Sequence, residues 1–516
     1  MARRFNTTGP CFPEEHYLLP PEDRCPGVMD LIEEKHFFVI HAPRQSGKTT
    51  LLNTLEGRLN STGKFHAIYC SLESVQGMDE LERGIPAVLG CLESSLRYHP
   101  KLKPQVELLA ANHWPLNTRI KDCLTSLIQA IDRPLVIFFD EADCLGGETL
   151  ISFLRQLRDG YVNRGRVPFV HSLALVGMRN IRDYRVQVRS ENQTLGSASP
   201  FNIAVESLTL KYFSRNEIAA LYQQHTDATG QAFPPELVDA VSGLTLGQPW
   251  LVNALAREMI VKTCRNDFTV PLTAGMAHDA AEQIILRRDT HIDSLLERLQ
   301  EERVRRIIEP VLLGEGDDIQ RQSNDFQFVR DLGLIRDDQG TLMIANPIYN
   351  EVIARTLNSN LQFSLPRELI HRWMDGTTLD LDGLLKSFQE FWRDHSEAWR
   401  ERFQYKEAAP YLVLLAFLQQ VVNGGAKISR EFATGTRRVD VCVEYAGRRY
   451  PIEMKLIRDR NTREEGLTQL SRYMDTLGAR QGWLLLFSAQ SAVPWEQRLT
   501  WETVAREERA IQVVGL

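Results

Sequence analysis

The sequence predicts an α/β protein with two separate sheets, and three observations lead to this fold class. Strand-like apolar runs alternate with helical patterns over residues 37–210, as in a parallel sheet with crossover helices. One of these runs leads directly into a loop and a helix start within residues 36–52. A new set of short strands begins near Ile428, after a linker at about 358–366. We therefore expect a large N-terminal α/β part and a smaller C-terminal one.

Length, charge and cysteine usage narrow the class of protein. The 516 residues suffice for about three or four domains. No apolar run approaches the roughly 20 residues of a membrane span, and the basic start of the chain lacks the apolar stretch of a secretory signal, so we expect a cytoplasmic protein without membrane contact. The eight cysteines form no Cys-x-x-Cys pair, which argues against a zinc site and a disulfide framework. Because the net charge is −7, contact with nucleic acid requires a local basic face.

The stretch 36–52 has the spacing of a phosphate-binding loop. An apolar strand is followed by HAPRQSGKTT, which closes with glycine, lysine and threonine. The backbone N–H groups of such a loop surround a triphosphate, the lysine neutralises β/γ oxygens, and the threonine hydroxyl binds Mg²⁺. Ala42 stands where the usual first glycine would be, which narrows the allowed backbone geometry. The nucleotide-binding residues that we expect are Ala42, Pro43, Arg44, Gln45, Ser46, Gly47, Lys48, Thr49, Thr50 and, from a later strand, Asp140.

Four apolar runs predict the strands of the first sheet, at residues 37–40, 65–70, 135–139 and 172–176. The third run ends in Asp140 and Glu141. Since a buried parallel strand delivers its last side chains beside the phosphate-binding loop, we expect Asp140 to hold Mg²⁺ and Glu141 to orient an attacking water. ATP and Mg²⁺ are therefore the expected cofactors, and hydrolysis is the expected reaction.

Three further polar residues near strand ends are candidates for the same reaction. Arg179 and Asn180 follow the fourth run, where a polar side chain can sense the γ-phosphate. Arg164 follows an amphipathic helix and can reach the nucleotide of a neighbouring subunit, since a guanidinium suits the charge of the transition state. The alternative, that all three are solvated residues at the ends of elements, stays open.

The rest of the N-terminal part divides into an arm, a helical segment and a helix-and-hairpin segment. Residues 1–30 are rich in turn formers and form an arm that either packs along the sheet and shapes the base pocket or remains a loose tail. Residues 211–287 are helical and form a lid, in which Ser214 and Glu217 make a capping box. Residues 288–357 combine helices with a hairpin, as in a winged helix. Its acidic side chains repel phosphates, so we favour internal packing over DNA binding.

Together the segments HAPRQSGKTT, LVIFFDEAD, GLTLGQPWLVNALA and GLIRDDQGTLMIANPIYNEVI resemble those of bacterial AAA-like P-loop ATPases, which are related to the STAND and archaeal ATPase groups. The resemblance covers about residues 1–357. It implies an ATPase core at 31–210, followed by the helical lid and the winged-helix domain.

The C-terminal part carries a second candidate site. Strands are expected at about 428–432, 438–444 and 450–456, and on the last of them Glu453 and Lys455 share a face. Asp440, on the adjoining strand, can meet them. Two carboxylates and a lysine in one place suit metal-dependent phosphodiester cleavage: Asp440 and Glu453 bind Mg²⁺ or Mn²⁺, and Lys455 positions the nucleophilic water. A charged cluster on apolar strands is costly unless it serves a function.

This arrangement resembles the PD-(D/E)XK nuclease superfamily over about residues 383–487 and implies a nuclease-like domain at 367–516. The resemblance implies that Glu407 is the acid of the first motif, on a helix, and that Gln469 supports the site from the helix after the strands. The alternative is an inactive nuclease fold with a solvated cluster of salt bridges. Basic residues nearby form either a positive face for nucleic acid or ordinary solvated surface: Arg437, Arg438, Arg448, Arg449, Lys455, Arg458, Arg460 and Arg463.

The sequence thus predicts a P-loop ATPase core with a helical lid and a winged helix, followed by a PD-(D/E)XK-type α/β nuclease domain. We expect an oligomer of this chain in which ATP controls cleavage of DNA, together with an unidentified trigger or partner protein. Defence against phage or mobile DNA is the setting that such fusions imply. One alternative is a nucleotide-dependent switch or scaffold whose C-terminal domain binds nucleic acid or a partner without cutting. Another is a nuclease that uses nucleotide only structurally, against which Glu141 argues, because a static clamp needs no water-orienting acid.

Overall fold

The computed structural model divides into two compact units, Met1–Arg287 with Arg330–Gly333 and Arg288–Val329 with Leu334–Leu516. No helix in the described part of the chain is long and apolar enough to cross a membrane. The structure describes residues 3–99, 101–106, 114–178, 204–287, 290–312, 319–362, 373, 377–402, 414, 417–418, 427–430, 441–457, 461–488, 495–506 and 509–516.

A five-stranded parallel sheet forms the centre of the first unit, with the strand order β2-β3-β4-β1-β5. The four predicted strands are present. The fifth was missed by the sequence reasoning, because its sequence AVESLT has no sustained apolar run. Because β4 lies between β1 and β3, the loop after β1 and the acids after β3 come to the same edge of the sheet. The strands are β1 (Phe37–His41), β2 (His66–Ser71), β3 (Leu135–Asp140), β4 (Ser172–Gly177) and β5 (Ala204–Thr209).

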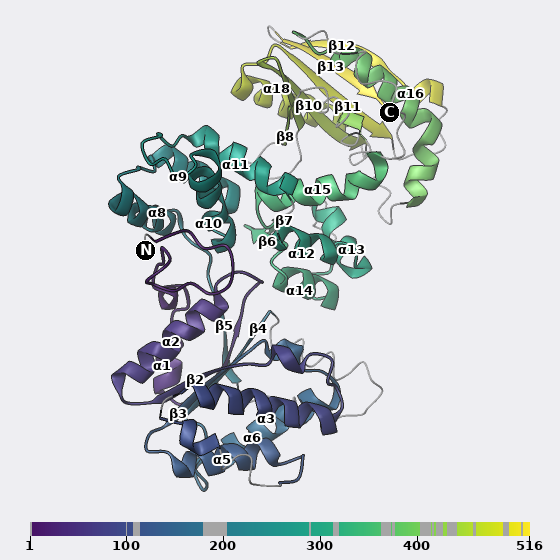
Figure 1. The fold of residues 1–516 in the computed structure, drawn as a ribbon. Coiled ribbons are helices and arrows are strands. Elements are labelled where there is room, and N and C mark those ends of the chain that lie inside the picture. The colour runs from purple at the N-terminus through teal and green to yellow at the C-terminus, as the bar shows by residue number, and fades with distance from the viewer. Residues whose placement is uncertain are drawn as a thin grey trace. The chain divides into compact units, whose positions relative to one another are not determined.

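Helices cover both faces of this sheet, as Figure 1 shows. Side chains that alternate along β1 enter different cores: Phe38 and Ile40 pack with residues of α1 and α2, whereas Phe37 and Val39 pack with residues of α3, α5 and α6. The result is the three-layer arrangement that the sequence predicts. The helices are α1 (Val28–Glu33), α2 (Lys48–Thr62), α3 (Leu81–Tyr98), α5 (Arg119–Ala130) and α6 (Gly147–Asn163), with short 3-10 turns η1 (Pro21–Arg24), η2 (Glu73–Val75), η3 (Lys103–Gln105) and η4 (Ala142–Cys144).

The segment 211–287, which the sequence predicts to be a lid, is mainly helical, and the predicted capping box is present at its start. The Ser214 N–H donates to Glu217 Oε2 at 2.7 Å, and the Glu217 N–H donates to Ser214 Oγ at 3.3 Å. Pro249 occupies the first turn of α10, where its missing N–H costs no helical hydrogen bond. The elements are α8 (Arg215–Thr229), α9 (Pro235–Thr245), α10 (Pro249–Arg257), the π-helical turn η5 (Glu258–Thr263) and α11 (Ala274–Arg287).

The second unit begins with helices and a hairpin. Two helices, α12 and α13, come first, and the predicted hairpin is formed by β6 and β7. Arginines pair with the hairpin's own acids, Arg321 with Asp337 at 2.6 Å and Arg336 with Asp338 at 2.8 Å, so this surface offers little net positive charge to DNA. The elements are α12 (Thr290–Arg298), α13 (Glu302–Leu312), α14 (Asn324–Asp331), β6 (Ile335–Asp338), β7 (Thr341–Ile344) and α15 (Pro347–Gln362).

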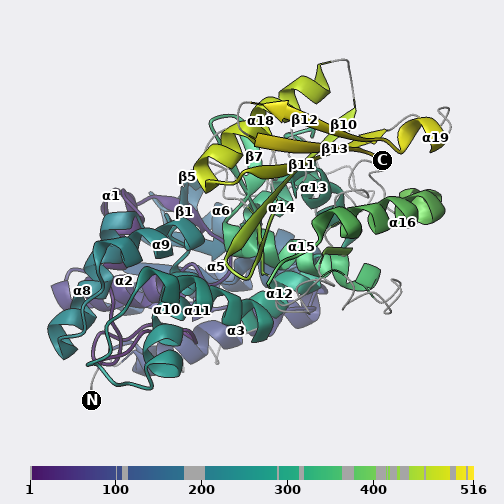
Figure 2. The same ribbon diagram turned by 90° about the horizontal axis from the view of Figure 1, so that it is seen from above.

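A mixed six-stranded sheet follows, in the order β12-β13-β11-β10-β9-β8. Strands β8, β9 and β10 are antiparallel neighbours, and β11 runs parallel to β10. Helix α18 covers one face and α16 the other, as Figure 2 shows. The sequence did not predict α16, β12 or β13, and the helix expected near residues 405–412 lies outside the described residues. The elements are α16 (Leu381–Arg402), β8 (Lys427–Arg430), β9 (Val441–Tyr445), β10 (Arg448–Ile457), α18 (Thr462–Leu477), β11 (Gln481–Ser488), α19 (Trp495–Arg498), β12 (Trp501–Arg506) and β13 (Arg509–Gly515).

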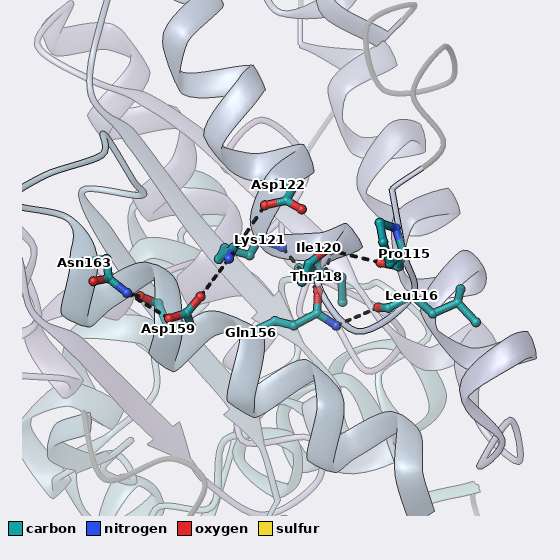
Figure 3. A network of polar contacts seen from close by, with 9 residues as sticks. All are labelled: Pro115, Leu116, Thr118, Ile120, Lys121, Asp122, Gln156, Asp159 and Asn163. Carbon is teal, nitrogen blue, oxygen red and sulfur yellow. Dashed lines mark hydrogen bonds and ion pairs between the residues drawn. The ribbon is translucent and has the colours of Figure 1, made fainter.

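A buried glutamine of α6 completes the start of α5 (Figure 3). Gln156 Oε1 accepts the N–H groups of Ile120 at 2.7 Å and Lys121 at 3.4 Å, and its Nε2 donates to Leu116 O at 3.0 Å. The N-cap residue Thr118 makes no side-chain cap of its own. A side chain from the neighbouring helix therefore satisfies amides that a helix start leaves free.

Replacing this glutamine tests the packing of α5 on α6. We expect Gln156→Leu to lower the free energy of unfolding of the first unit by about 1–3 kcal/mol, because buried amides lose their acceptor. Thermal and urea denaturation measure this change. Asn163→Ala is the matched control on the same helix, since Asn163 is half-buried and its side chain bonds only to Asp159 within α6. A loss of stability in the control as large as in Gln156→Leu would contradict the explanation.

Candidate nucleotide site and C-terminal charged cluster

The loop between β1 and α2 has the backbone of an anion cradle. Gln45 and Gly47 adopt left-handed conformations, with φ of 57° and 97°, and α2 begins at Lys48 immediately after. The positive φ of Gly47 favours glycine, and a β-carbon there would lie 2.8 Å from Arg24 Nη2, so a larger residue would displace this guanidinium. Ala42, by contrast, has no positive φ and is buried, so its methyl group is compatible with the loop. This explains why alanine can replace the usual glycine.

The loop lysine is buried beside the acids of β3. Lys48 Nζ donates to the carbonyls of Ala42 at 2.9 Å and Pro43 at 3.0 Å. Burial lowers the pKa of Lys48, and the nearby carboxylates of Glu141 and Asp140 oppose this shift. Phosphate oxygens are charged acceptors and bind an ammonium more strongly than carbonyls do. The lysine is therefore placed to take the β/γ oxygens of a nucleotide.

Asp140 ends β3 with a carboxylate that is only 1% exposed. Its Oδ2 accepts the hydroxyls of Thr49 and Tyr69, each at 3.1 Å, and its Oδ1 accepts the N–H of Glu141 at 3.0 Å. Burial raises the pKa of Asp140, while Lys48 and these hydrogen bonds oppose the shift. The threonine hydroxyl and the carboxylate thus meet in one place, and oxygen ligands of this kind fit Mg²⁺.

Glu141 follows in a left-handed conformation, with φ of 55°. Such a conformation costs a non-glycine residue about 1–3 kcal/mol and is commonly held at functional sites. Burial raises the pKa of Glu141, and the charge of Lys48 opposes this. The backbone turn places Glu141 next to the Mg²⁺-binding candidates, as a water-orienting acid requires.

The other loop residues play smaller parts. Arg44 and Gln45 are exposed, and Ser46 Oγ donates to Pro43 O at 2.8 Å within the loop. Thr50 is buried, and its hydroxyl accepts the N–H of Cys11 at 3.0 Å. Thr50 therefore connects α2 to the N-terminal arm.

Sequence reasoning missed two residues at this site. Tyr69 stands near the end of β2, which pairs with the strand that carries the acids. The available signal was the prediction of β2 itself, because a parallel neighbour of that strand brings its last residues close to the acids. Arg24 lies in the turn-rich arm and donates to Ser46 O at 3.1 Å. No local pattern in the arm singles it out, because its role depends on contacts distant in sequence.

The three further candidates near strand ends have different positions. Arg179 and Asn180 lie outside the described residues, directly after Met178. Arg164 donates to Lys35 O at 2.6 Å, and its guanidinium lies 4.0 Å from the ring centre of Tyr161. Since Lys35 precedes β1, Arg164 lies at the amino-terminal edge of the sheet, opposite the phosphate-binding loop. A role for Arg164 in a neighbouring subunit stays a prediction.

In the second unit, Glu453 and Lys455 meet Gln469 beneath α18. Lys455 Nζ lies 2.6 Å from Glu453 Oε1 and donates to Gln469 Oε1 at 2.6 Å. Glu453 is 1% and Lys455 3% exposed. Neither carboxylate oxygen of Glu453 accepts a hydrogen bond of regular geometry from the described residues. A donor or a cation from outside the described residues would therefore stabilise this buried acid.

The remaining parts of the second candidate site are only partly described. Asp440 and Glu407 lie outside the described residues. Among the residues that the structure does describe, no group of three or more His, Cys, Asp or Glu is placed to hold a metal. Arg449 pairs with Glu444 at 3.0 Å, on the edge of the hairpin. Of the other basic candidates, Arg448, Lys455 and Arg463 are described, whereas Arg437, Arg438, Arg458 and Arg460 are not.

Comparison with known proteins identifies the N-terminal part. A family model described as an AAA-like domain matches residues 27–355, well over half of the chain. The chain belongs to the AAA-like domain family. Membership in this family implies a P-loop ATPase fold that binds nucleotide, and that the phosphate-binding loop and the acids after β3 form its site stays a prediction. A second family model, described as a domain of unknown function (DUF8371), matches residues 386–491. No curated protein matches the chain.

Several solved structures share parts of the fold at low identity. The Walker-type ATPase PABY2304 of Pyrococcus abyssi is 16% identical, with a TM-score of 0.48, over 68% of this chain and 99% of that one. The Orc1 protein of Aeropyrum pernix, solved in complex with DNA, is 12% identical, with a TM-score of 0.35, over 66% and 93%. The RuvB Holliday junction branch migration motor of Thermotoga maritima is 11% identical, with a TM-score of 0.32, over 63% and 91%. These likenesses are too distant to carry an argument about function.

Two substitutions separate binding from hydrolysis at the nucleotide site. We expect Lys48→Ala to abolish nucleotide binding, because it removes the buried cation of the loop. Glu141→Gln is expected to keep binding and to lower kcat by about 100-fold or more, because the amide cannot accept a proton from water. Titration with a fluorescent ATP analogue and a phosphate-release assay measure the two effects. Lys64→Ala, which changes an exposed lysine just beyond α2, is the matched control. ATP hydrolysis by Glu141→Gln at the wild-type rate would contradict the proposed role of Glu141.

Proposed function

We propose that the AAA-like domain hydrolyses ATP with Mg²⁺ and thereby controls a metal-dependent nuclease in the C-terminal domain, which cleaves DNA. The observation that carries the first half is the meeting of Thr49, Asp140 and Glu141 beside a buried loop lysine. Defence against phage or mobile DNA, in an oligomer of this chain, is the setting that we propose by analogy.

In the proposed hydrolysis each residue has one task. Lys48 binds the β/γ oxygens, and the loop N–H groups hold the triphosphate in place. Thr49 and Asp140 would hold Mg²⁺, which supplies neutralising charge to the phosphates when bound. Glu141 orients the attacking water and accepts its proton, a task that its raised pKa and its position after β3 support.

The buried Glu453, with Lys455 and Gln469, supports the nuclease half. The order of described elements also agrees with what the resemblance implies, since three antiparallel strands are followed by a helix and a parallel strand. Glu453 would hold a divalent metal with Asp440, and the metal would activate water for phosphodiester cleavage. Lys455, held by Gln469, would position that water.

A specific observation favours the alternative of a switch or scaffold that does not cut. Glu453 and Lys455 are both almost completely buried, whereas a nuclease must bring its acids to a phosphodiester. A buried ion pair that only supports the fold would show the same contact. The alternative therefore predicts binding of nucleic acid or of a partner, without cleavage.

The deciding experiment incubates the full chain with plasmid and single-stranded DNA, in Mg²⁺ or Mn²⁺, with and without ATP. We expect cleavage in wild type and its loss in Glu453→Gln and Asp440→Asn, because an amide binds a divalent metal far more weakly than a carboxylate does. Both variants should retain ATP hydrolysis. Asp475→Asn is the matched control, since this exposed acid on α18 pairs with Arg509 and lies outside the cluster.

Each outcome assigns a function. Cleavage that only the two acid variants lose supports the nuclease, and its dependence on ATP measures the coupling between domains. Loss of ATP hydrolysis along with cleavage in Asp440→Asn would contradict two separate sites. Robust ATP hydrolysis without cleavage under any condition would favour the switch.

A further inference from the structure

We propose that Arg24 is a positioning residue that holds the phosphate-binding loop in its binding geometry and joins it to the hinge of the helical lid, so that nucleotide binding and lid position are coupled. The hinge is the segment 210–214, between β5 and α8. This inference concerns the nucleotide site of the AAA-like domain alone and is independent of any nuclease activity.

Arg24 is a buried cation without an acidic partner in contact. Its side chain is 5% exposed, and no described carboxylate lies within ion-pair distance of it. Burial lowers the pKa of Arg24 to about 10, while the more distant charge of Glu217 opposes the shift, so Arg24 stays charged at neutral pH. A buried charge is costly unless its hydrogen bonds are satisfied. The contacts that do satisfy this one are backbone carbonyls and an aromatic face.

The first contact fixes a peptide plane of the loop. Arg24 Nη1 donates to Ser46 O at 3.1 Å. In a planar trans peptide the carbonyl and the following N–H point in opposite directions, so holding the Ser46 carbonyl outward turns the Gly47 N–H inward, toward the position of the phosphates. The close approach of Nη2 to Gly47, where a β-carbon would lie 2.8 Å away, limits movement of the same plane.

The second set of contacts reaches the hinge. The same Nη1 donates to Lys211 O at 3.1 Å, and the Lys211 N–H donates to Arg24 O at 3.0 Å. The guanidinium lies 4.6 Å from the ring centre of Phe213. Phe213 in turn donates its N–H to Gly247 O at 2.9 Å, just before α10. One guanidinium nitrogen therefore connects the loop with the start of the lid.

The arm that carries Arg24 is also tied to the lid helices at other points. The Gln224 side chain on α8 accepts the N–H of Leu18 at 3.2 Å and donates to its carbonyl at 3.0 Å. Trp250 Nε1 on α10 donates to Thr7 O at 2.8 Å. The arm cannot shift without disturbing these bonds. A change of the loop on nucleotide binding is thus passed to the lid through Arg24 and the arm.

The test compares three variants of the full chain. Arg24→Ala removes the guanidinium that contacts both the loop and the hinge. Arg24→Lys keeps the charge but lacks the planar guanidinium that donates several hydrogen bonds. Arg58→Ala is the matched control. Arg58 pairs with Glu22 at 3.2 Å and so also ties the arm to α2, without touching the loop. Affinity for a fluorescent ATP analogue with Mg²⁺ is measured by titration. Hydrogen exchange of α8 and α10 is measured with and without saturating nucleotide, and thermal unfolding shows whether each variant folds.

We expect Arg24→Ala to weaken nucleotide binding about tenfold or more, as for the loss of a charged hydrogen bond, and to remove the nucleotide-induced protection of α8 and α10. Arg24→Lys should recover part of both, and Arg58→Ala should match wild type. A folded Arg24→Ala with wild-type affinity, or with an unchanged lid response at saturation, would overturn the proposal. If Arg24→Ala does not fold, Arg24→Lys decides: unchanged affinity would overturn the proposal, and several-fold weaker binding supports it. Failure of wild type to bind nucleotide would instead count against the proposed ATPase.

Discussion

Burial of opposite charges at the carboxyl edge of the first sheet is the constraint on which the AAA-like domain depends. Lys48 and Asp140 are both buried, and each is satisfied by a different set of groups: loop carbonyls for the lysine, and two hydroxyls with an N–H for the acid. Such charges are tolerated only where their hydrogen bonds are complete. The strand order brings the ends of β1 and β3 to one edge, with β4 between them. The groups that complete the hydrogen bonds of Lys48 and Asp140 therefore lie within reach of them.

How much of the fold and of the nucleotide site the sequence could predict depends on how far apart in sequence the interacting residues lie. The loop, the four apolar strands and the capping box of Ser214 and Glu217 depend on neighbours within a few residues, and all are present in the structure. Arg24 and Tyr69 contact groups 22 and 71 positions away, so no short window of sequence shows either contact, and only the predicted strand at 65–70 could have indicated Tyr69. Strand β5 was missed for a similar reason, because it is an edge strand without an apolar run and is held in place by its pairing with the distant β1.

In the C-terminal domain, too, elements with local sequence patterns were predicted and others were missed. Its three antiparallel strands, the helix after them and the parallel strand β11 follow from local patterns and turns. The outer strands β12 and β13 complete the sheet and lie outside the segment whose motifs guided the prediction. Helix α16 lies at the start of that segment but carries none of its motifs. Of the predicted site residues, Glu453, Lys455 and Gln469 lie together, because residues two apart on β10 face α18.

The two candidate sites differ in how completely their buried acids are satisfied. Asp140 accepts three hydrogen bonds from described residues, whereas Glu453 has the Lys455 ammonium close by and no regular hydrogen bond. An unsatisfied buried polar group costs about 1–3 kcal/mol, so a further partner stabilises Glu453 more than it would Asp140. A divalent cation supplies such a partner, and so does a donor from a residue outside the described set. If a divalent cation is the partner, Mg²⁺ raises the thermal stability of the fold, whereas a protein donor gives no such dependence. The measurement uses a Lys48→Ala background, which lacks nucleotide binding. A rise in melting temperature with Mg²⁺ that Glu453→Gln abolishes would identify the cation as the partner.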